Sequence, residues 1–156
     1  MVIKELRLTY EEFSSVSECP DEIQNLIKMA SEAAEKAYAP YSKFQVGVAI
    51  LLADGSRYTA SNQENKAYPS GLCAERAVLF YVNGLKPDIA VSKMVLAAFE
   101  NGKLVKEPAY PCGSCRQVMM ESEERGKQAI ETWMVGQNRI HKTSTIQTLL
   151  PLKFSF

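Results

Sequence analysis

Two short stretches organise this sequence: Cys73-Ala74-Glu75-Arg76, and further along the chain Pro111-Cys112-Gly113-Ser114-Cys115-Arg116. Together they hold three thiols and one carboxylate in the patterns C-x-E and P-C-x-x-C. Zn²⁺ prefers soft thiolate ligands in a tetrahedron, and a catalytic zinc site keeps one of its four positions for water. The three cysteines would supply three ligands and leave the fourth position open. We therefore predict one zinc ion here, with Glu75 placed to move protons for the water.

Two other interpretations of the cysteines stay open at this point, a closed structural zinc site and a redox-active Cys-x-x-Cys pair. A closed site needs a fourth ligand, and outside the two stretches only Cys19 and His141 could provide it. Neither lies at a metal-ligand spacing from the others, and Cys19 is better interpreted as a buried free thiol. An open coordination position favours a catalytic site, with the ligands Cys73, Cys112 and Cys115.

Length and composition limit the class of protein. The chain has 156 residues, of which 46% are hydrophobic, and this predicts one globular domain over 1–156. Eighteen basic and eighteen acidic residues cancel, which argues against nucleic acid as a partner. No apolar run is long enough to span a bilayer, and the first residues lack the hydrophobic region of a signal peptide. We expect a cytoplasmic protein with reduced cysteines and no membrane partner.

Hydrophobic periodicity predicts an α/β fold with a mixed sheet covered by helices. Residues 2–9 alternate as in a short edge strand, and residues 10–19 are predicted to form a connection. The predicted helices cover about 20–38, 72–82 and 112–126. The predicted strands cover 46–52, 57–60, 92–99, 130–135 and 139–142. This arrangement puts both cysteine stretches at helix N-termini, where the positive end of the helix stabilises thiolates.

The neighbours of Cys73 on its helix suggest separate roles. Arg76 follows three residues later and shares the face of Cys73. Glu75 lies about 200° round the helix from Cys73, so it is not an obvious ligand. Three thiolates with Zn²⁺ carry one net negative charge. We therefore predict that Arg76, and in part Arg116, compensates the thiolates while Glu75 serves the water.

A polar segment before the first cysteine is a candidate for binding a sugar. Residues two apart on an extended chain point to the same side, so Asn62 and Glu64 would present an amide and a carboxylate together. Such a pair suits hydroxyl groups, which both donate and accept hydrogen bonds. Phe44, at the start of a strand, is interpreted either as a core residue or as an aromatic that stacks on a ring.

These stretches resemble the small cytidine deaminases, in the class with three cysteine ligands that forms homotetramers. The C-x-E and P-C-x-x-C patterns are the zinc-deaminase signature with Cys in place of the usual His. The resemblance runs from about residue 21 to residue 154, and leaves 1–19 as an N-terminal extension of open role. It implies a three-layer α-β-α fold with a mixed five-stranded sheet and a zinc site at two helix N-termini. The segments that carry it are 39–47, 62–65, 71–76, 111–117 and 149–154.

The resemblance also implies an activity and a set of site residues. The activity is zinc-dependent hydrolytic deamination of cytidine and deoxycytidine to uridine and deoxyuridine, with release of ammonia, as in pyrimidine salvage. The implied site contains one Zn²⁺ per subunit on Cys73, Cys112 and Cys115, a proton shuttle at Glu75, and Arg76 beside the thiolates. The implied substrate contacts are Phe44 stacked on the pyrimidine, Asn62 and Glu64 on the ribose, the Ala74 N–H on the base carbonyl, and Phe154 from a neighbouring subunit.

Other functions remain as alternatives. The same chemistry could act on a nucleotide or on an aminopyrimidine antibiotic such as blasticidin S, and Asn62 with Glu64 favours a free ribose. Nucleic-acid editing is disfavoured by the net charge of zero. A non-catalytic zinc module is disfavoured by Glu75, which a structural site does not need. Zinc content together with turnover of free cytidine separates these functions.

Overall fold

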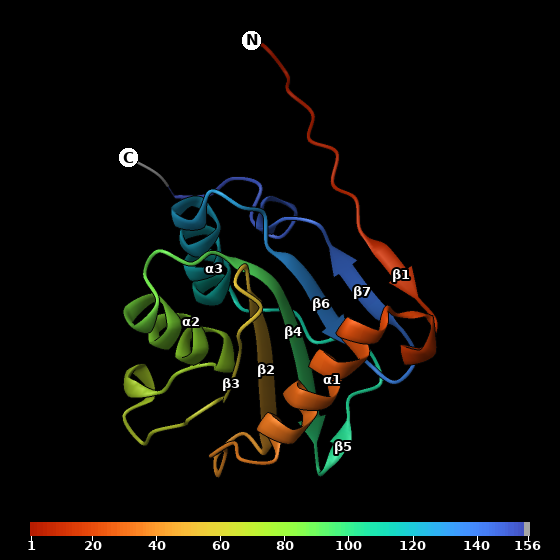
Figure 1. Cartoon of the computed structure of the whole chain (residues 1–156), viewed down its shortest axis with the longest axis vertical. Coiled ribbons are helices and arrows are strands. Elements are labelled where there is room, and N and C mark those ends of the chain that lie inside the picture. The colour runs from red at the N-terminus through yellow and green to blue at the C-terminus, as the bar shows by residue number, and fades with distance from the viewer. Residues whose placement is uncertain (155–156) are drawn as a thin grey trace.

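A mixed seven-stranded sheet forms the centre of the fold, and helices cover both of its faces (Figure 1). The computed structural model describes residues 1–154. The strands are β1 (Glu11–Phe13), β2 (Phe44–Leu52), β3 (Arg57–Ser61), β4 (Val91–Glu100), β5 (Lys103–Leu104), β6 (Glu131–Val135) and β7 (Ile140–Thr143). Their order is β1-β7-β6-β4-β2-β3, with β5 paired to β4. Strands β4 and β6 are parallel, and the other pairs are antiparallel.

Three α-helices make the two outer layers: α1 (Asp21–Ala34), α2 (Ala74–Leu85) and α3 (Gly113–Gly126). Helix α1 packs on one face of the sheet, while α2 and α3 lie side by side on the other. Short 3₁₀ turns cover Val16–Glu18, Tyr68–Ser70 and Ile146–Thr148. The predicted three-layer arrangement is confirmed. Within residues 1–154, no helix combines the length and the apolar character needed to cross a membrane.

The position of strand β2 between two cores explains why its sequence is almost continuously apolar. Successive side chains of a strand point to opposite faces. Val48, Ile50 and Leu52 therefore pack in the core beneath α2 and α3. Ala49 and Leu51 point the other way, into the core beneath α1. Both faces of β2 are buried, so the alternation of apolar and polar residues that marks a half-exposed strand is absent.

Helix α1 approaches β2 so closely that only glycine fits at residue 47. A Cβ on Gly47 would lie 1.9 Å from the carbonyl oxygen of Ala30 and 2.4 Å from the backbone nitrogen of Ala34. Both are backbone atoms, so neither can move aside without shifting the helix. This contact holds the layer that contains α1 against the strand that begins at Phe44.

Two details of the predicted sheet were wrong. The sheet has seven strands, not five, because β1 and β5 add short edge strands of three and two residues. Such short strands carry no readable alternation, and only pairing with β7 and β4 defines them. Residues 2–9 form no strand although they alternate, and β1 lies within the segment predicted as a connection.

Two helix boundaries also differ from the prediction. Helix α1 ends at Ala34, short of the predicted end near residue 38. The backbone of Tyr38 instead pairs with residues 62–64, through Tyr38 N to Asn62 O at 3.1 Å and Glu64 N to Tyr38 O at 2.8 Å. This pairing draws the chain out of the helix. Helix α2 continues past the predicted end to Leu85, with Gly84 inside its last turn.

Replacing Gly47 by alanine should lower the free energy of unfolding by roughly 1–3 kcal/mol, because overpacking against backbone forces α1 away from the sheet. Denaturant unfolding measures the loss. Gly84→Ala is the matched control: its Cβ meets no atom within 4 Å, so it should stabilise α2 slightly. Equal stability of Gly47→Ala and the wild-type protein would contradict the close approach.

Candidate active site

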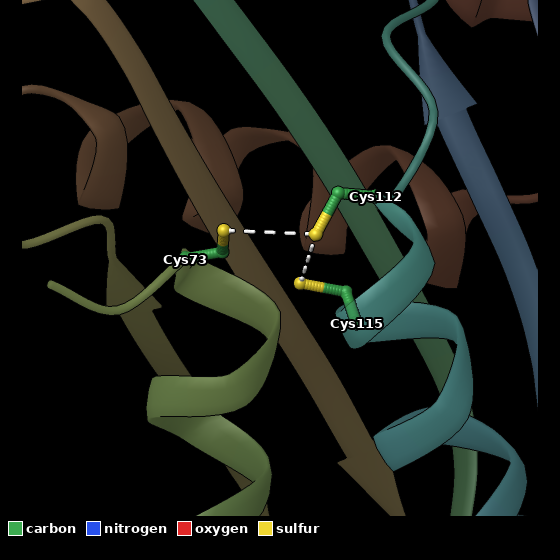
Figure 2. A group of neighbouring side chains, drawn as sticks. All are labelled: Cys73, Cys112 and Cys115. Atoms are coloured by element: carbon green, nitrogen blue, oxygen red, sulfur yellow. Dashed lines mark hydrogen bonds between the residues drawn. The ribbon is translucent and has the colours of Figure 1, made fainter. Parts of the chain in front are cut away.

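Three cysteine sulfurs come together where α2 and α3 begin (Figure 2). The Sγ atom of Cys112 lies 4.0 Å from that of Cys73 and 3.3 Å from that of Cys115. All three sulfurs lie within 4.8 Å of one another. A tetrahedral zinc with Zn–S bonds of 2.3 Å requires sulfurs about 3.8 Å apart, so this set fits the ion. Among residues 1–154, neither Cys19 nor His141 joins the group.

Both helix N-termini supply cysteines in equivalent ways. Cys73 is the N-cap of α2, and Cys112 is the N-cap of α3, with Cys115 in the first turn. The first N–H groups of a helix have no partners within it, and they create a positive potential that favours thiolates. The predicted position of the cysteine stretches at two helix N-termini is confirmed.

Protonation in the sulfur group is already biased toward metal binding. The pKa of Cys73 is lowered to about 5, first by a hydrogen bond from the Cys115 thiol and then by Arg76. The pKa of Cys115 is raised, because it donates to Cys73 and is buried. The Cys73 sulfur is therefore a thiolate at neutral pH, and a zinc ion would displace the thiol proton of Cys115.

Glu75 lies beside the sulfurs in the first turn of α2, and only 4% of its surface is exposed. Burial raises the pKa of its carboxyl. Cys73 has an extended backbone as N-cap, so the angle of about 200° calculated for two residues within one helix does not describe this pair. Both side chains instead border the same cavity.

Arg76 contributes positive charge near the sulfurs of Cys73 and Cys115. It lowers the pKa of Cys73. Its Nε atom is buried and has no hydrogen-bond partner in the described part of the chain. Arg116, by contrast, binds backbone: its Nε donates to the carbonyl of Pro111 at 2.9 Å and its Nη1 to that of Leu149 at 2.9 Å. Arg116 thus fixes the segment before Cys112.

A cavity of about 240 Å³, here called the inner cavity, opens beside the sulfurs. The residues of its wall used below are Phe44, Asn62, Cys73, Glu75, Tyr110 and Cys112. A wider hollow of about 470 Å³ adjoins it, and Asn62, Glu64, Cys73 and Arg76 are among the residues that line it. The structure therefore brings the predicted residues from β2, the 62–64 segment and the two helix N-termini to one place.

Asn62 and Glu64 both bind backbone as well as facing these spaces. Asn62 Oδ1 accepts from the N–H of Val46 at 2.8 Å, and its Nδ2 donates to the carbonyl of Phe44 at 2.9 Å. Glu64 Oε2 accepts from the N–H groups of Tyr41 at 2.9 Å and Ser42 at 3.3 Å. These bonds fix the segment that leads into β2. Asn62 keeps a second amide hydrogen, and Glu64 a second oxygen.

Tyr110 lines the inner cavity and was not predicted as a site residue, although it directly precedes Pro111-Cys112. Its hydrogen-bond partner, His141, lies far along the chain, so no local pattern marks Tyr110.

Phe154 is 72% exposed and is not among the residues that line either space. Its carbonyl accepts from Gln117 Nε2 of α3 at 3.5 Å. The final Phe156 lies outside the described residues.

Comparison with known proteins agrees with this geometry. The family described as "Cytidine and deoxycytidylate deaminase zinc-binding region" matches residues 20–130. A cytidine deaminase of Halalkalibacterium halodurans is 47% identical over 100 residues, covering 63% of this chain and 70% of its own. One from Sporosarcina psychrophila is 38% identical over 136 residues, covering 86% and 92%.

Solved structures lead to the same family. The cytidine deaminase of Burkholderia pseudomallei matches with a TM-score of 0.71 at 36% identity, over 84% of this chain and 98% of its own. That of Mycobacterium tuberculosis matches with a TM-score of 0.67 at 31% identity, over 88% and 100%. The matched region contains the three clustered cysteines and Glu75, so the fold, the ligand set and the sequence agree. The chain therefore belongs to the family of zinc-binding cytidine and deoxycytidylate deaminases.

Proposed function

We propose that this protein catalyses the hydrolytic deamination of cytidine and deoxycytidine to uridine and deoxyuridine, with release of ammonia. The observation that carries the proposal is the meeting of three cysteine sulfurs and a buried carboxylate at one small cavity, in a chain of this family. A structural zinc site would need neither an open cavity nor Glu75. A place in pyrimidine salvage follows from the reaction, which recovers uridine from a preformed nucleoside.

Each group has a defined part in the proposed reaction. Zinc, when held by the three cysteines, supplies a Lewis acid that makes water nucleophilic at neutral pH. The Glu75 carboxylate takes the two protons of that water in turn, and it delivers one to ring nitrogen N3 and the other to the departing amine. The overall reaction exchanges the amino group of C4 for the oxygen of water. The raised pKa of Glu75 suits a group that must both accept and donate protons. Arg76 balances the charge of the thiolates.

The residues that line the inner cavity and the wider hollow suggest where each part of the substrate binds. We propose that Phe44 stacks on the pyrimidine in the inner cavity, where the Ala74 N–H at the start of α2 binds the base carbonyl. Asn62 binds the ribose with its second amide hydrogen and Glu64 with its second carboxylate oxygen, because the other atoms of both groups bind backbone. The Glu64 carboxylate, whose pKa is lowered first by a hydrogen bond from Ser42, keeps its charge and would repel a nearby phosphate. Nucleosides are thus favoured over nucleotides.

We further propose a single domain over 1–156, with 1–19 as an N-terminal extension, that assembles as a homotetramer. In this assembly each inner cavity is completed by Phe154 of a neighbouring subunit. The high exposure of Phe154 in one chain supports this arrangement. The proposed location is the cytoplasm, where a reducing environment keeps the three thiols available for zinc. The proposed partners include neither nucleic acid nor a membrane.

The function is tested by zinc content and by the release of ammonia from cytidine, deoxycytidine, CMP and blasticidin S. We expect turnover of the two nucleosides only. Glu75→Gln should retain one zinc per chain and the wild-type fold, yet lose roughly 10²–10⁴-fold in kcat, the usual contribution of a positioned acid–base group. Near-normal turnover of cytidine by this variant would refute the mechanism, and preferred turnover of CMP or blasticidin S would change the substrate.

Arg76→Ala should weaken zinc retention or activity by about 10–100-fold, because groups that contact metal ligands commonly contribute this much. Competition with a chelator measures zinc retention, and nucleoside turnover measures activity. Arg57→Ala is the control, since Arg57 is exposed on β3 and lies on neither cavity. If both variants keep zinc and activity equally well, Arg76 does not compensate the thiolates.

Phe154→Ala should raise KM for cytidine and leave zinc bound, because an aromatic ring that closes a cavity contributes about 1.5–3 kcal/mol when it is buried. Sedimentation of the wild-type protein should show four chains. Leu152→Ala is a control at another exposed position of the same tail. A fully active monomer, or an unchanged KM in Phe154→Ala, would exclude the shared site.

A further inference from the structure

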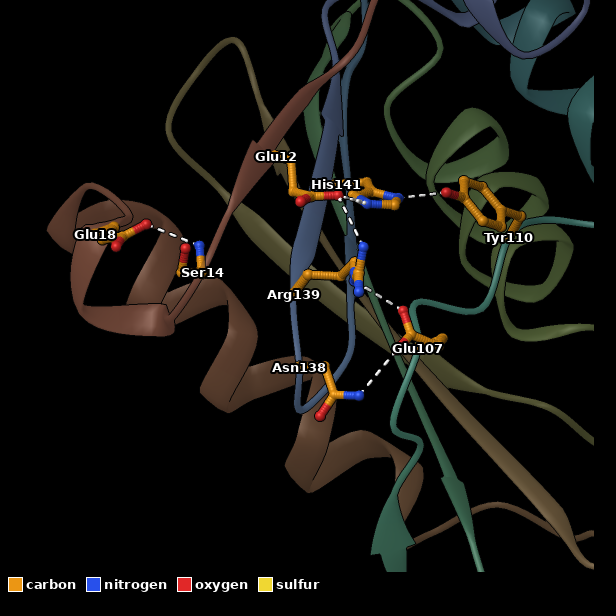
Figure 3. Close-up of polar contacts among 8 residues, drawn as sticks. All are labelled: Glu12, Ser14, Glu18, Glu107, Tyr110, Asn138, Arg139 and His141. Carbon is orange, nitrogen blue, oxygen red and sulfur yellow. Dashed lines mark hydrogen bonds and ion pairs between the residues drawn. The ribbon is translucent and has the colours of Figure 1, made fainter.

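A continuous line of polar contacts joins the first strand to the inner cavity (Figure 3). The buried ring of His141, on β7, stands in the middle of this line. Its Nε2 lies 2.8 Å from Oε2 of Glu12, on β1, and its Nδ1 contacts the hydroxyl of Tyr110. Tyr110 in turn lines the inner cavity together with Cys112. A residue of the N-terminal extension is therefore connected to the cavity wall through one imidazole.

The chemistry of Glu12, His141 and Tyr110 determines which group donates and which accepts in each hydrogen bond. The pKa of Glu12 is lowered, first by its hydrogen bond with His141 and also by Arg139, so Glu12 is ionised and only accepts. His141 must then carry its proton on Nε2. In the neutral ring the other nitrogen, Nδ1, is an acceptor, so it receives the O–H of Tyr110. Glu12 thus selects the tautomer of His141 that can hold the Tyr110 hydroxyl.

A second contact ties Glu12 to the segment that carries Tyr110. Arg139 Nη1 lies 3.4 Å from Glu12 Oε2, and Arg139 Nε lies 2.9 Å from Oε2 of Glu107. Asn138 Nδ2 donates to the other oxygen of Glu107 at 2.9 Å. Glu107 precedes Tyr110 by three residues in the segment that ends at Cys112. Both contacts therefore connect Glu12 to the segment 107–112, in which Tyr110 and Cys112 line the inner cavity.

We infer that Glu12 is a positioning residue, which acts through His141 to hold the side chain of Tyr110 in the wall of the inner cavity. Glu12 and His141 both lie outside the family match of residues 20–130. The N-terminal extension thereby contributes to substrate binding without touching the cavity itself. The inference rests on the proposed function where it concerns nucleoside binding, and its second test below is independent of that function.

The kinetic test uses the zinc-loaded full-length protein. Glu12→Ala should raise KM for cytidine roughly two- to tenfold, the usual net effect of losing one hydrogen bond, while zinc content and kcat stay near wild type. Glu12→Gln should restore most of the affinity, because its amide oxygen can still accept from Nε2 of His141. Tyr110→Phe should raise KM similarly, and Glu12→Ala should add nothing in that background.

Glu11→Ala is the matched control, because it tests whether a weaker attachment of β1 to the sheet by itself changes KM. Glu11 neighbours Glu12 on the same strand and pairs with Lys142 of β7 at 2.9 Å, yet it is not part of the line to Tyr110. It should leave KM unchanged. Equal effects of Glu11→Ala and Glu12→Ala, or additive effects of Glu12→Ala and Tyr110→Phe, would overturn the inference.

A spectroscopic test follows because the chain contains one histidine. The ¹⁵N NMR signals of labelled His141 should show a protonated Nε2 and an unprotonated Nδ1 at neutral pH, also in Glu12→Gln. In Glu12→Ala they should shift toward the other tautomer. A proton on Nδ1 in the wild-type protein overturns the inference. Should wild-type protein fail to deaminate cytidine, the proposed function fails, and these signals still decide the role of Glu12.

Discussion

The structure depends on the packing of α2 beside α3 over one face of the sheet. Val78 and Leu79 from α2 and Met119 from α3 share a core with the facing side chains of β2 and β4. A hydrogen bond of 2.9 Å from Asn83 to Ser122 joins the two helices farther along. Because this packing sets the two N-termini side by side, Cys73 and Cys112 come within 4.0 Å although 39 residues separate them. A metal needs that proximity, and neither helix alone provides it.

Polar side chains around the inner cavity bind backbone or one another before any substrate arrives. Asn62 holds both Phe44 and Val46, and Glu64 holds the segment just before them. An amide or carboxylate fixed in this way loses little further rotational freedom when a ligand binds. The same contacts restrain the segment that carries Phe44. The cavity is therefore arranged by its own hydrogen bonds.

The N-terminal extension is part of this arrangement. Its strand β1 pairs with β7 at the edge of the sheet, and Glu12 faces the ring of His141 there. Residues 1–10 lie beyond this strand without regular structure. Residues 1–19 thus include an edge strand of the central sheet. An edge strand of three residues makes few backbone pairs, and side-chain contacts of Glu11 and Glu12 with β7 add to them.

The sequence by itself determined the features that depend on neighbouring residues. The three cysteines of the candidate zinc site and Glu75 are contained in two short patterns, and the main helices and strands in their local periodicities. Tertiary structure alone decided the rest. Strands β1 and β5 are too short to show a period, and Tyr38 leaves its helical pattern because residues 62–64 offer it backbone partners. The line from Glu12 to Tyr110 joins residues up to 129 positions apart, and such contacts form only once the whole sheet has folded.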